Sequence, residues 1–111
     1  MLQNNLSHFS PKVIDKLINK IKSSFKKIMS DIYGNYFSQR LYKICSLEQR
    51  ILILDSIKET FISISKTKPG SHVAQSLIEQ ASSSEEKIKI MKFIQNYELE
   101  MALDTEGKFL N

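Results

Sequence analysis

Three glycines divide the 111-residue chain at nearly equal intervals. They stand at Gly34, Gly70 and Gly107, so successive glycines are 36 and 37 residues apart. A fixed period of this length is typical of proteins built from repeated units, none of which can bury its apolar side chains without a neighbour. The chain is therefore expected to fold as a stack of units that share one continuous core.

The residues around the glycines repeat with the same period. Phe25 aligns with Phe61 before the glycine, and Leu41 aligns with Leu77 after it. One additional serine in the run 82–84 shifts the register by one residue, after which the aliphatic positions agree again, pairing Ile51 with Ile88, Ile53 with Ile90, Leu54 with Met91 and Ile57 with Ile94. The pattern predicts the end of one unit, two complete units and the start of another, in residues 11–24, 25–60, 61–97 and 98–111.

Helices are the predicted building blocks of each unit. Residues 11–22 carry apolar side chains at 13, 14, 17, 18 and 21, a stripe of helical period that follows Ser10 as an N-cap. Capping boxes predict two further helix starts, at Ser46 and Ser83. Shorter helices are expected to end near the first two glycines, with new helices starting at Asn35 and Ser71. The predicted fold class is all-α, an α-solenoid.

The composition excludes several classes of protein. Apolar residues make up 41% and charged residues 25% of the chain, as in globular domains, so neither a disordered tail nor a membrane protein is expected. The single cysteine, Cys45, excludes an internal disulfide and aligns with Ala81, which indicates a small core residue. No Cys/His spacing suggests a metal site, no cofactor is implied, and no apolar run approaches the length that spans a membrane. We expect a soluble, intracellular protein.

Basic residues are concentrated toward the N-terminus. Residues 1–34 carry 6 basic and 2 acidic side chains, whereas residues 70–111 carry 4 and 7. This imbalance permits a polyanionic partner such as nucleic acid, but lysine-rich helices are often only solvated faces. Charge alone therefore leaves the partner open.

A motif recurs after two of the glycines and carries a family resemblance. It reads G-N-Y-x-x-Q from Gly34 and G-S-H-x-x-Q from Gly70, within the stretches IMSDIYGNYFSQRLYKICSLEQRILILDSI and FISISKTKPGSHVAQSLIEQA. These stretches resemble consecutive repeats of the Pumilio, or PUF, family of RNA-binding proteins. The resemblance covers about residues 13–111 and implies a right-handed α-solenoid of three-helix repeats.

The resemblance also implies that each repeat reads one RNA base, with two side chains on the base edge and a third stacked on the base. In the first repeat, Asn35 and Gln39 take the edge and Tyr36 stacks. Residues i and i+4 of a helix share a face, and a carboxamide offers both a donor and an acceptor to a base edge. The Asn/Gln pair suits uracil and resembles the family's uracil-reading combination. Arg40 and Lys43, further along the chain, face either phosphate or only water.

In the second repeat, the resemblance implies that Ser71 and Gln75 read the edge and that His72 stacks. A short hydroxyl beside a glutamine leaves room for a purine and is similar to the adenine-reading combination. Because the resemblance implies antiparallel binding, the predicted dinucleotide is 5′-AU-3′. In the last repeat only Lys108 and Phe109 lie within the chain, so the base that it reads is not predicted.

The same residues also have a purely structural interpretation. Asn35 and Ser71 follow a glycine at an expected helix start, where both residue types are favoured N-caps. The aromatic residues that follow them are of types that often pack in a partly buried position. The RNA interpretation requires the amide side chains of Asn35, Gln39 and Gln75 to face solvent on the inner curve of the solenoid.

No catalytic constellation is present in the sequence, so we expect a non-enzymatic protein that binds single-stranded RNA sequence-specifically. The resemblance implies recognition of messenger RNA 3′ untranslated regions in the cytoplasm, leading to repression or decay through protein co-regulators. Two alternatives stay open: a helical-repeat scaffold for protein partners, and a PUF-like protein of ribosome assembly that grips RNA by its backbone and shape. Apolar side chains at both ends of the array also predict self-association.

Overall fold

The computed structural model describes residues 6–110, except for the side chains of residue 7 and residues 104–110. Within this range the chain forms helices and short connections and contains no strand, so the predicted all-α class is confirmed. In chain order the elements are η1 (Leu6–His8), α2 (Pro11–Ile21), η2 (Lys22–Ser24), α3 (Phe25–Met29), α4 (Gly34–Ile44), α5 (Leu47–Ser56), α6 (Phe61–Ser65), α7 (Lys68–Gln80) and α8 (Ser84–Leu110).

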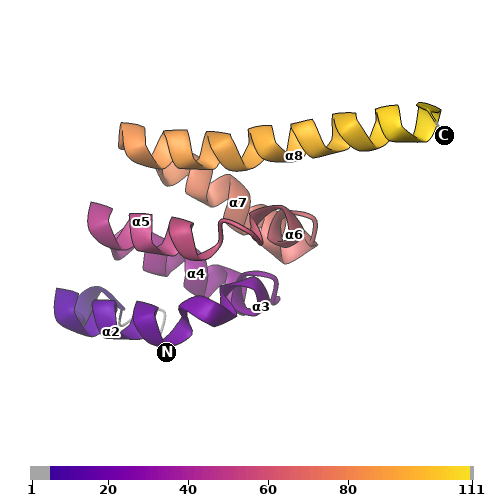
Figure 1. Ribbon diagram of the computed structural model, residues 1–111. Coiled ribbons are helices and arrows are strands. Elements are labelled where there is room, and N and C mark those ends of the chain that lie inside the picture. Colours follow the sequence, from indigo (N-terminus) through magenta and orange to yellow (C-terminus); the bar gives the residue numbers. More distant parts are fainter. Residues whose placement is uncertain (1–5, 111) are drawn as a thin grey trace.

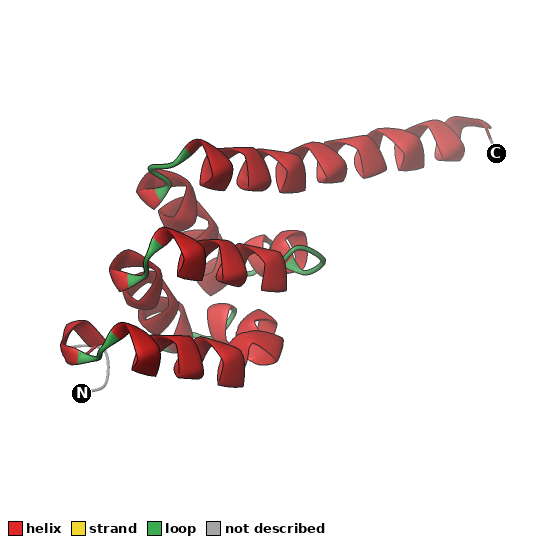
Figure 2. Ribbon diagram, turned by 60° about the vertical axis from the view of Figure 1, so that its left-hand side comes forward, coloured by secondary structure: helices red, strands yellow, loops and turns green. Residues whose placement is uncertain are grey.

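The helices stack in three rows (Figures 1 and 2). Helices α2, α5 and α8 lie side by side in one row, α4 packs on α7 in a second, and the short helices α3 and α6 form a third. The order α3, α4, α5 recurs as α6, α7, α8, so each row gains one helix with each unit. The chain is therefore an α-solenoid, as the repeat predicted.

One hydrophobic core runs through all the layers. Phe25 and Phe61 are both buried, and so are Leu41 and Leu77, as their alignment predicted. On α2, Ile14 and Ile18 are buried. The other apolar residues of the α2 stripe are less buried, and Val13 is 45% exposed. This exposure agrees with the expectation that apolar side chains are left uncovered at this end of the array.

The last helix departs from the predicted pattern in two ways. It presents Ile90 and Phe93 to the core, whereas Met91 is 56% exposed although it aligns with the buried Leu54. The backbone of residues 98–110 continues α8 without a break, so no new helix begins where a further unit was predicted to start at residue 98. The division of the chain into repeat units stays a prediction. No helix in the described range is long and apolar enough to cross a membrane.

The predicted N-caps of helices α2, α5 and α8 are confirmed. The Ser10 hydroxyl accepts a hydrogen bond from the Val13 amide at 3.3 Å. Ser46 and Gln49 form a reciprocal capping box at the start of α5. At the start of α8 the Glu86 amide donates to the Ser83 hydroxyl at 3.1 Å, and the Glu86 carboxylate accepts from the Ser83 amide at 3.2 Å.

Other residues than those predicted cap α4 and α7. Asp31 Oδ2 accepts hydrogen bonds from the amides of Tyr33 and Gly34, each at 2.8 Å, and these bonds hold the pKa of this carboxyl below its usual value. In the next unit the hydroxyl of Thr67, which aligns with Asp31, accepts from the Gly70 amide at 2.9 Å. The N-cap interpretation of residues 35 and 71 is therefore wrong.

The repeated glycines mark a close approach of two helices rather than a special backbone conformation. Neither glycine has a positive φ. A Cβ atom on Gly34 would lie 2.2 Å from the carbonyl oxygen of Ile28, and one on Gly70 would lie 1.9 Å from that of Ile64. Only glycine lets α4 and α7 start this close to the end of the preceding short helix.

Candidate nucleic-acid interface

Helices α4 and α7 carry the two copies of the recurring motif and pack against each other. An open hollow of about 610 Å³ lies where they meet. The first unit lines it with Tyr36, Gln39, Arg40, Lys43 and Arg50, and the second with Ser76 and Gln80. The hollow therefore joins a predicted stacking residue, a predicted edge reader and the two cations expected to face either phosphate or water to side chains of the following unit.

Asn35 lies in the interior rather than on the surface. It is only 3% exposed, and its Nδ2 donates to the carbonyl oxygens of Asp31 at 3.0 Å and Ile32 at 2.9 Å. Its Oδ1 accepts a hydrogen bond from Gln39 Nε2 at 3.2 Å. The expectation that Asn35 faces solvent is wrong, because its amide completes backbone hydrogen bonds at the start of α4. In this state it orients Gln39.

The other two motif residues of the first repeat remain accessible. The Tyr36 side chain is exposed, and Gln39 is half-buried beside it in the hollow. One amide hydrogen of Gln39 is donated to Asn35, while no hydrogen bond to Gln39 Oε1 is present among the described residues. A carboxamide held in this way keeps one acceptor and one donor for a ligand.

Arg40 and Lys43 supply positive charge to the same hollow. Both are exposed on α4, and neither takes part in an ion pair within the described part of the chain. Side chains of this kind are suited to phosphate contacts, which give affinity without base preference.

The second repeat presents its motif residues differently. Ser71, His72 and Gln75 are all exposed on α7, as the RNA interpretation requires for Gln75. The Ser71 hydroxyl donates to the carbonyl oxygen of Lys68 at 2.7 Å. Gln75 Nε2 donates to the Glu79 carboxylate at 3.2 Å, so the predicted edge reader of the second repeat has an acidic neighbour.

Sequence reasoning missed the residues that connect the two repeats. Gln80 Nε2 donates across to the backbone oxygen of Gln39 at 3.2 Å and to the Ser76 hydroxyl at 2.9 Å. The motif spacing did not single out Gln80 or Ser76, because the repeat pairs them with the unlike residues Ile44 and Arg40. The predicted residues Lys108 and Phe109 fall in the last turns of α8, and their side chains lie outside the described residues.

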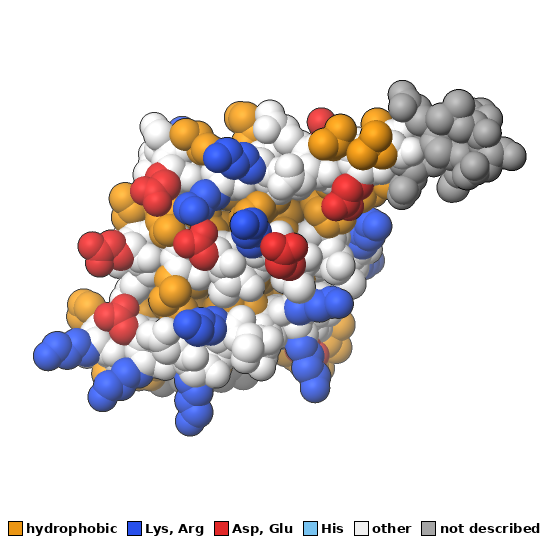
Figure 3. All heavy atoms as spheres, in the orientation of Figure 1, with side chains coloured by type: hydrophobic (Ala, Val, Ile, Leu, Met, Phe, Trp, Pro, Cys, Tyr) orange, Lys and Arg blue, Asp and Glu red, His pale blue; other side chains and the backbone are white. Residues whose placement is uncertain are grey.

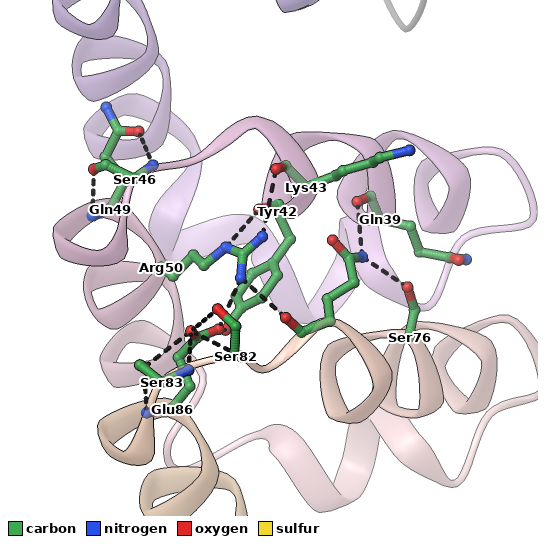
Figure 4. Close-up of polar contacts among 11 residues, drawn as sticks. Gln39, Tyr42, Lys43, Ser46, Gln49, Arg50, Ser76, Ser82, Ser83 and Glu86 are labelled. Carbon is green, nitrogen blue, oxygen red and sulfur yellow. Dashed lines mark hydrogen bonds and ion pairs between the residues drawn. The ribbon is translucent and has the colours of Figure 1, made fainter.

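A polar cluster of Tyr42, Arg50 and Glu86 adjoins the hollow, which Arg50 also lines (Figure 4). The Tyr42 hydroxyl donates to Glu86 Oε2 at 2.7 Å, and the Arg50 guanidinium contacts the same oxygen at 3.1 Å. Burial, together with the neighbouring carboxylate, raises the pKa of Tyr42 above its usual value. Burial alone would raise the pKa of Glu86, but hydrogen bonds from Tyr42, Ser83 and Ser82 outweigh it and lower that pKa to about 2.

Known proteins match this chain along most of its length. The Pumilio-family RNA binding repeat model matches residues 24–58 and 61–94. A Pumilio domain-containing protein of Schizosaccharomyces pombe is 30% identical over 99 residues, which cover 88% of this chain and 13% of that protein. Pumilio homolog 12 of Arabidopsis thaliana is 32% identical over 88 residues, which cover 77% of this chain and 15% of that protein.

A solved structure shares the architecture as well as the sequence pattern. A Puf4 double mutant bound to a Cox17 RNA 3′ UTR recognition sequence matches with a TM-score of 0.76 at 29% identity. The match covers 86% of this chain and 30% of that chain, so the present sequence spans only a small part of its relatives. Because the repeat model covers more than half of the residues, the chain belongs to the Pumilio family.

Proposed function

We propose that the chain binds single-stranded RNA at the face formed by α4 and α7 and that it is not an enzyme. The observation that carries this proposal is the hollow in which Tyr36 and Gln39 lie beside Arg40 and Lys43. An aromatic ring, a partly free carboxamide and two cations are the groups that hold a base and its phosphates. The RNA in the related Puf4 structure supports the same class of ligand.

The first repeat is proposed to read uracil through Gln39, with Tyr36 stacked on a base. Gln39 Oε1 and its second amide hydrogen can pair with the adjacent donor and acceptor of the uracil edge. Asn35 acts on this base by holding Gln39, and it contacts the base itself only if its own side chain leaves the two backbone carbonyls. Arg40 and Lys43 bind phosphate.

The second repeat is proposed to read adenine through Ser71 and Gln75, with His72 as the stacking residue. All three side chains are exposed on one helix. Gln75 has to exchange its bond to Glu79 for the base, which lowers the net gain from that contact. Antiparallel binding then gives 5′-AU-3′ as the dinucleotide read by the two repeats.

The biological role that we propose is recognition of messenger RNA 3′ untranslated regions in the cytoplasm, leading to repression or decay through protein co-regulators. The recognition sequence bound by the related Puf4 protein comes from a 3′ UTR, which supports this class of target. Two bases give little target specificity, so co-regulators or further repeats have to contribute the rest.

We propose that the chain self-associates at the α8 end of the stack. An apolar groove of about 530 Å³ lies between α7 and α8, and Ile78 and Met91, 49% and 56% exposed, line it. We infer a second copy as its occupant, because the N-terminal residues 1–34 have the opposite net charge to residues 70–111. Figure 3 shows the lysines that gather along the α2 end of the molecule.

The self-association proposal is tested by the molar mass from light scattering over a range of concentrations. Met91→Glu should lower the mass of the assembly to that of a single chain, and raising the salt concentration should act in the same direction. A mass that corresponds to one chain at every concentration would refute it.

A filter-binding comparison tests the RNA proposal. The chain should bind a single strand that contains 5′-AU-3′ more tightly than its base-scrambled control at both low and moderate salt. Equal affinity for both strands with a steep dependence on salt would instead indicate a reader of backbone and shape. No binding to either strand would indicate a scaffold for protein partners.

A further inference from the structure

Arg50 joins the ends of the two RNA-facing helices. It stands on α5, but its Nε donates to the carbonyl oxygen of Tyr42 at 3.0 Å and its Nη2 to that of Lys43 at 3.4 Å, at the end of α4. Its Nη1 donates to the carbonyl oxygen of Gln80 at 3.1 Å, at the end of α7. Helix C-termini carry partial negative charge, so one guanidinium stabilises both ends at once.

The guanidinium is itself fixed from two further sides. It lies 4.7 Å from the centre of the Tyr42 ring, and its Nη1 contacts Glu86 Oε2 on α8 at 3.1 Å. The Arg50 side chain is 13% exposed and that of Glu86 is 1% exposed. Glu86 in turn is held by the Ser83 capping box. Four helices, α4, α5, α7 and α8, therefore meet at one side chain.

Arg50 lines the hollow but has little left to offer a ligand. Of the five N–H groups of an arginine side chain, four donate to protein oxygens here. The hydrogen bond from Gln80 to the Gln39 backbone is a further direct polar tie between α4 and α7. Arg50 therefore affects the RNA-facing surface by holding the helices in place and not by contacting RNA.

We propose that Arg50 is a positioning residue that sets the distance between α4 and α7, and thereby the spacing at which two adjacent bases are read. The proposal rests on the proposed function, since helix spacing matters to RNA only if both helices read bases. A lysine cannot replace this arginine, because one ammonium group cannot reach carbonyl oxygens on two helices with the geometry of a planar fork.

The experiment compares the wild-type chain with Arg50→Lys and with Lys89→Gln as the matched control. Lys89 on α8 pairs with Asp55 on α5 at 2.8 Å, so this control removes an ion pair between the same two layers without touching α4 or α7. Each protein is titrated with a strand containing 5′-AU-3′, with the same strand carrying one cytidine between the two bases, and with a scrambled strand.

Wild type and Lys89→Gln should prefer the adjacent bases to the separated bases by about tenfold, the loss expected when one stacked base is misplaced. Arg50→Lys should lose most of this preference. A purely structural role would weaken binding to both strands by the same factor and leave the preference unchanged, and that result would overturn the proposal. If Arg50→Lys is unfolded by circular dichroism, Glu86→Gln, which weakens the hold on Arg50, replaces it with the same expected loss.

A measurement without RNA separates the two proposals. Spin labels on Lys43→Cys and Glu79→Cys, at equivalent places on α4 and α7, report the distance between the helices by pulsed electron paramagnetic resonance. The distance distribution should broaden in Arg50→Lys and stay narrow in Lys89→Gln. If it is unchanged in Arg50→Lys, the positioning role is refuted. If wild type does not distinguish the 5′-AU-3′ strand from the scrambled one, the proposed function fails, and the label distances alone decide the role of Arg50.

Discussion

The two repeats carry the same motif but present it in different surroundings. On α4, the Gln39 side chain is half-buried and bonded to Asn35, and the Gln39 backbone oxygen accepts a hydrogen bond from Gln80 of the following unit. On α7, Gln75 is exposed and bonded to Glu79 on its own helix. The comparison shows that the hollow around Gln39 is formed by both units, because Ser76 and Gln80 of α7 line it together with residues of α4.

The two repeats also differ in charge at matched positions. Lys43 of the first repeat corresponds to Glu79 of the second, and Arg40 corresponds to Ser76. Arg40 and Lys43 both line the hollow, whereas the second repeat places Glu79 beside Gln75, its proposed edge reader. The first repeat should therefore supply most of the affinity for a polyanion, and the second should contribute mainly base preference.

The contacts between successive layers differ as well. Gln49 and Glu86 hold the same place in the capping boxes of α5 and α8. Gln49 Nε2 donates to Asp15 Oδ1 at 2.7 Å and to the Pro11 carbonyl oxygen at 3.1 Å, so this contact is made by an uncharged donor. Glu86 instead forms an ion pair with Arg50. Of these two contacts between layers, only the one that Glu86 makes therefore depends on the ionisation of the capping residue.

The largest predicted effect is a loss of stability in acid that depends on Glu86. Its pKa is about 2 in the folded chain against the usual value of 4.5, so its contribution is complete above pH 4.5 and is lost as the pH falls toward 2. A shift of this size corresponds to about 3 kcal/mol of unfolding free energy. Chemical denaturation of wild type and Glu86→Gln across this pH range measures the difference between them.

A neighbouring carboxylate provides the control for that experiment. Glu85→Gln removes an exposed carboxylate next to Glu86 and should keep the acid loss of the wild type. Glu86→Gln should be less stable at neutral pH, because Arg50 then lacks its anionic partner, and should lose less stability as the pH falls. A parallel decline of wild type and Glu86→Gln between pH 4.5 and 2 would show that Glu86 is not the group that titrates.

Much of the fold followed from the sequence because it rests on periodic patterns. The capping boxes at Ser46 and Ser83 and the aligned core residues gave the helix starts and the stacked layers correctly. The starts of α4 and α7 did not follow, since Asp31 and Thr67 cap from positions three residues before each glycine. Asp31 and Thr67 align in the repeat, but they lie before the helix starts expected at Asn35 and Ser71, so their role as caps was not predicted.

The candidate site was only half predictable. The motif gave the exposed residues Tyr36 and Gln75, but it did not show that Asn35 is buried. The difference depends on whether the amide can reach the carbonyl oxygens of the preceding turn, which is a matter of three-dimensional geometry. The contributions of Gln80 and Arg50 are contacts between units, and a pattern within one unit cannot reveal them.

The two proposed stacking residues, Tyr36 and His72, should contribute unequally to binding. Tyr36→Ala should weaken binding to the 5′-AU-3′ strand by about 1–3 kcal/mol, because a stacked base loses its aromatic platform. His72→Ala should cost less, since the smaller ring covers less of a base. Equilibrium titration with a fluorescent strand measures both, and Tyr36→Phe, which keeps the ring, should bind nearly as wild type does. Equal losses for the two alanine variants would contradict the proposed difference between the repeats.

Replacing the proposed edge readers, Gln39 and Gln75, should have a smaller effect, on both stability and base preference. Gln39→Glu places a carboxylate oxygen opposite Asn35 Oδ1, so it should cost about 1 kcal/mol of stability and move base preference away from uracil. Gln75→Glu faces Glu79 in solvent, where repulsion is screened, and should change adenine preference with little loss of stability. Thermal melts and binding to strands with single base changes test both. A loss of stability in Gln39→Glu without a change in base preference would mean that Gln39 is only structural.

The smallest predicted effect comes from making the two repeats alike in charge. Glu79→Lys gives the second repeat the cation that Lys43 gives the first, and it also frees the Gln75 amide. The slope of log affinity against log salt should steepen by about 0.7, the value for one additional contact to a single-stranded phosphate, and affinity should rise a few-fold at low salt. Glu59→Lys changes the net charge equally in the exposed connection between α5 and α6 and should leave that slope nearly unchanged. If both variants steepen the slope equally, the gain comes from net charge and not from the position beside Gln75, and the charge difference between the two reading helices has no local role.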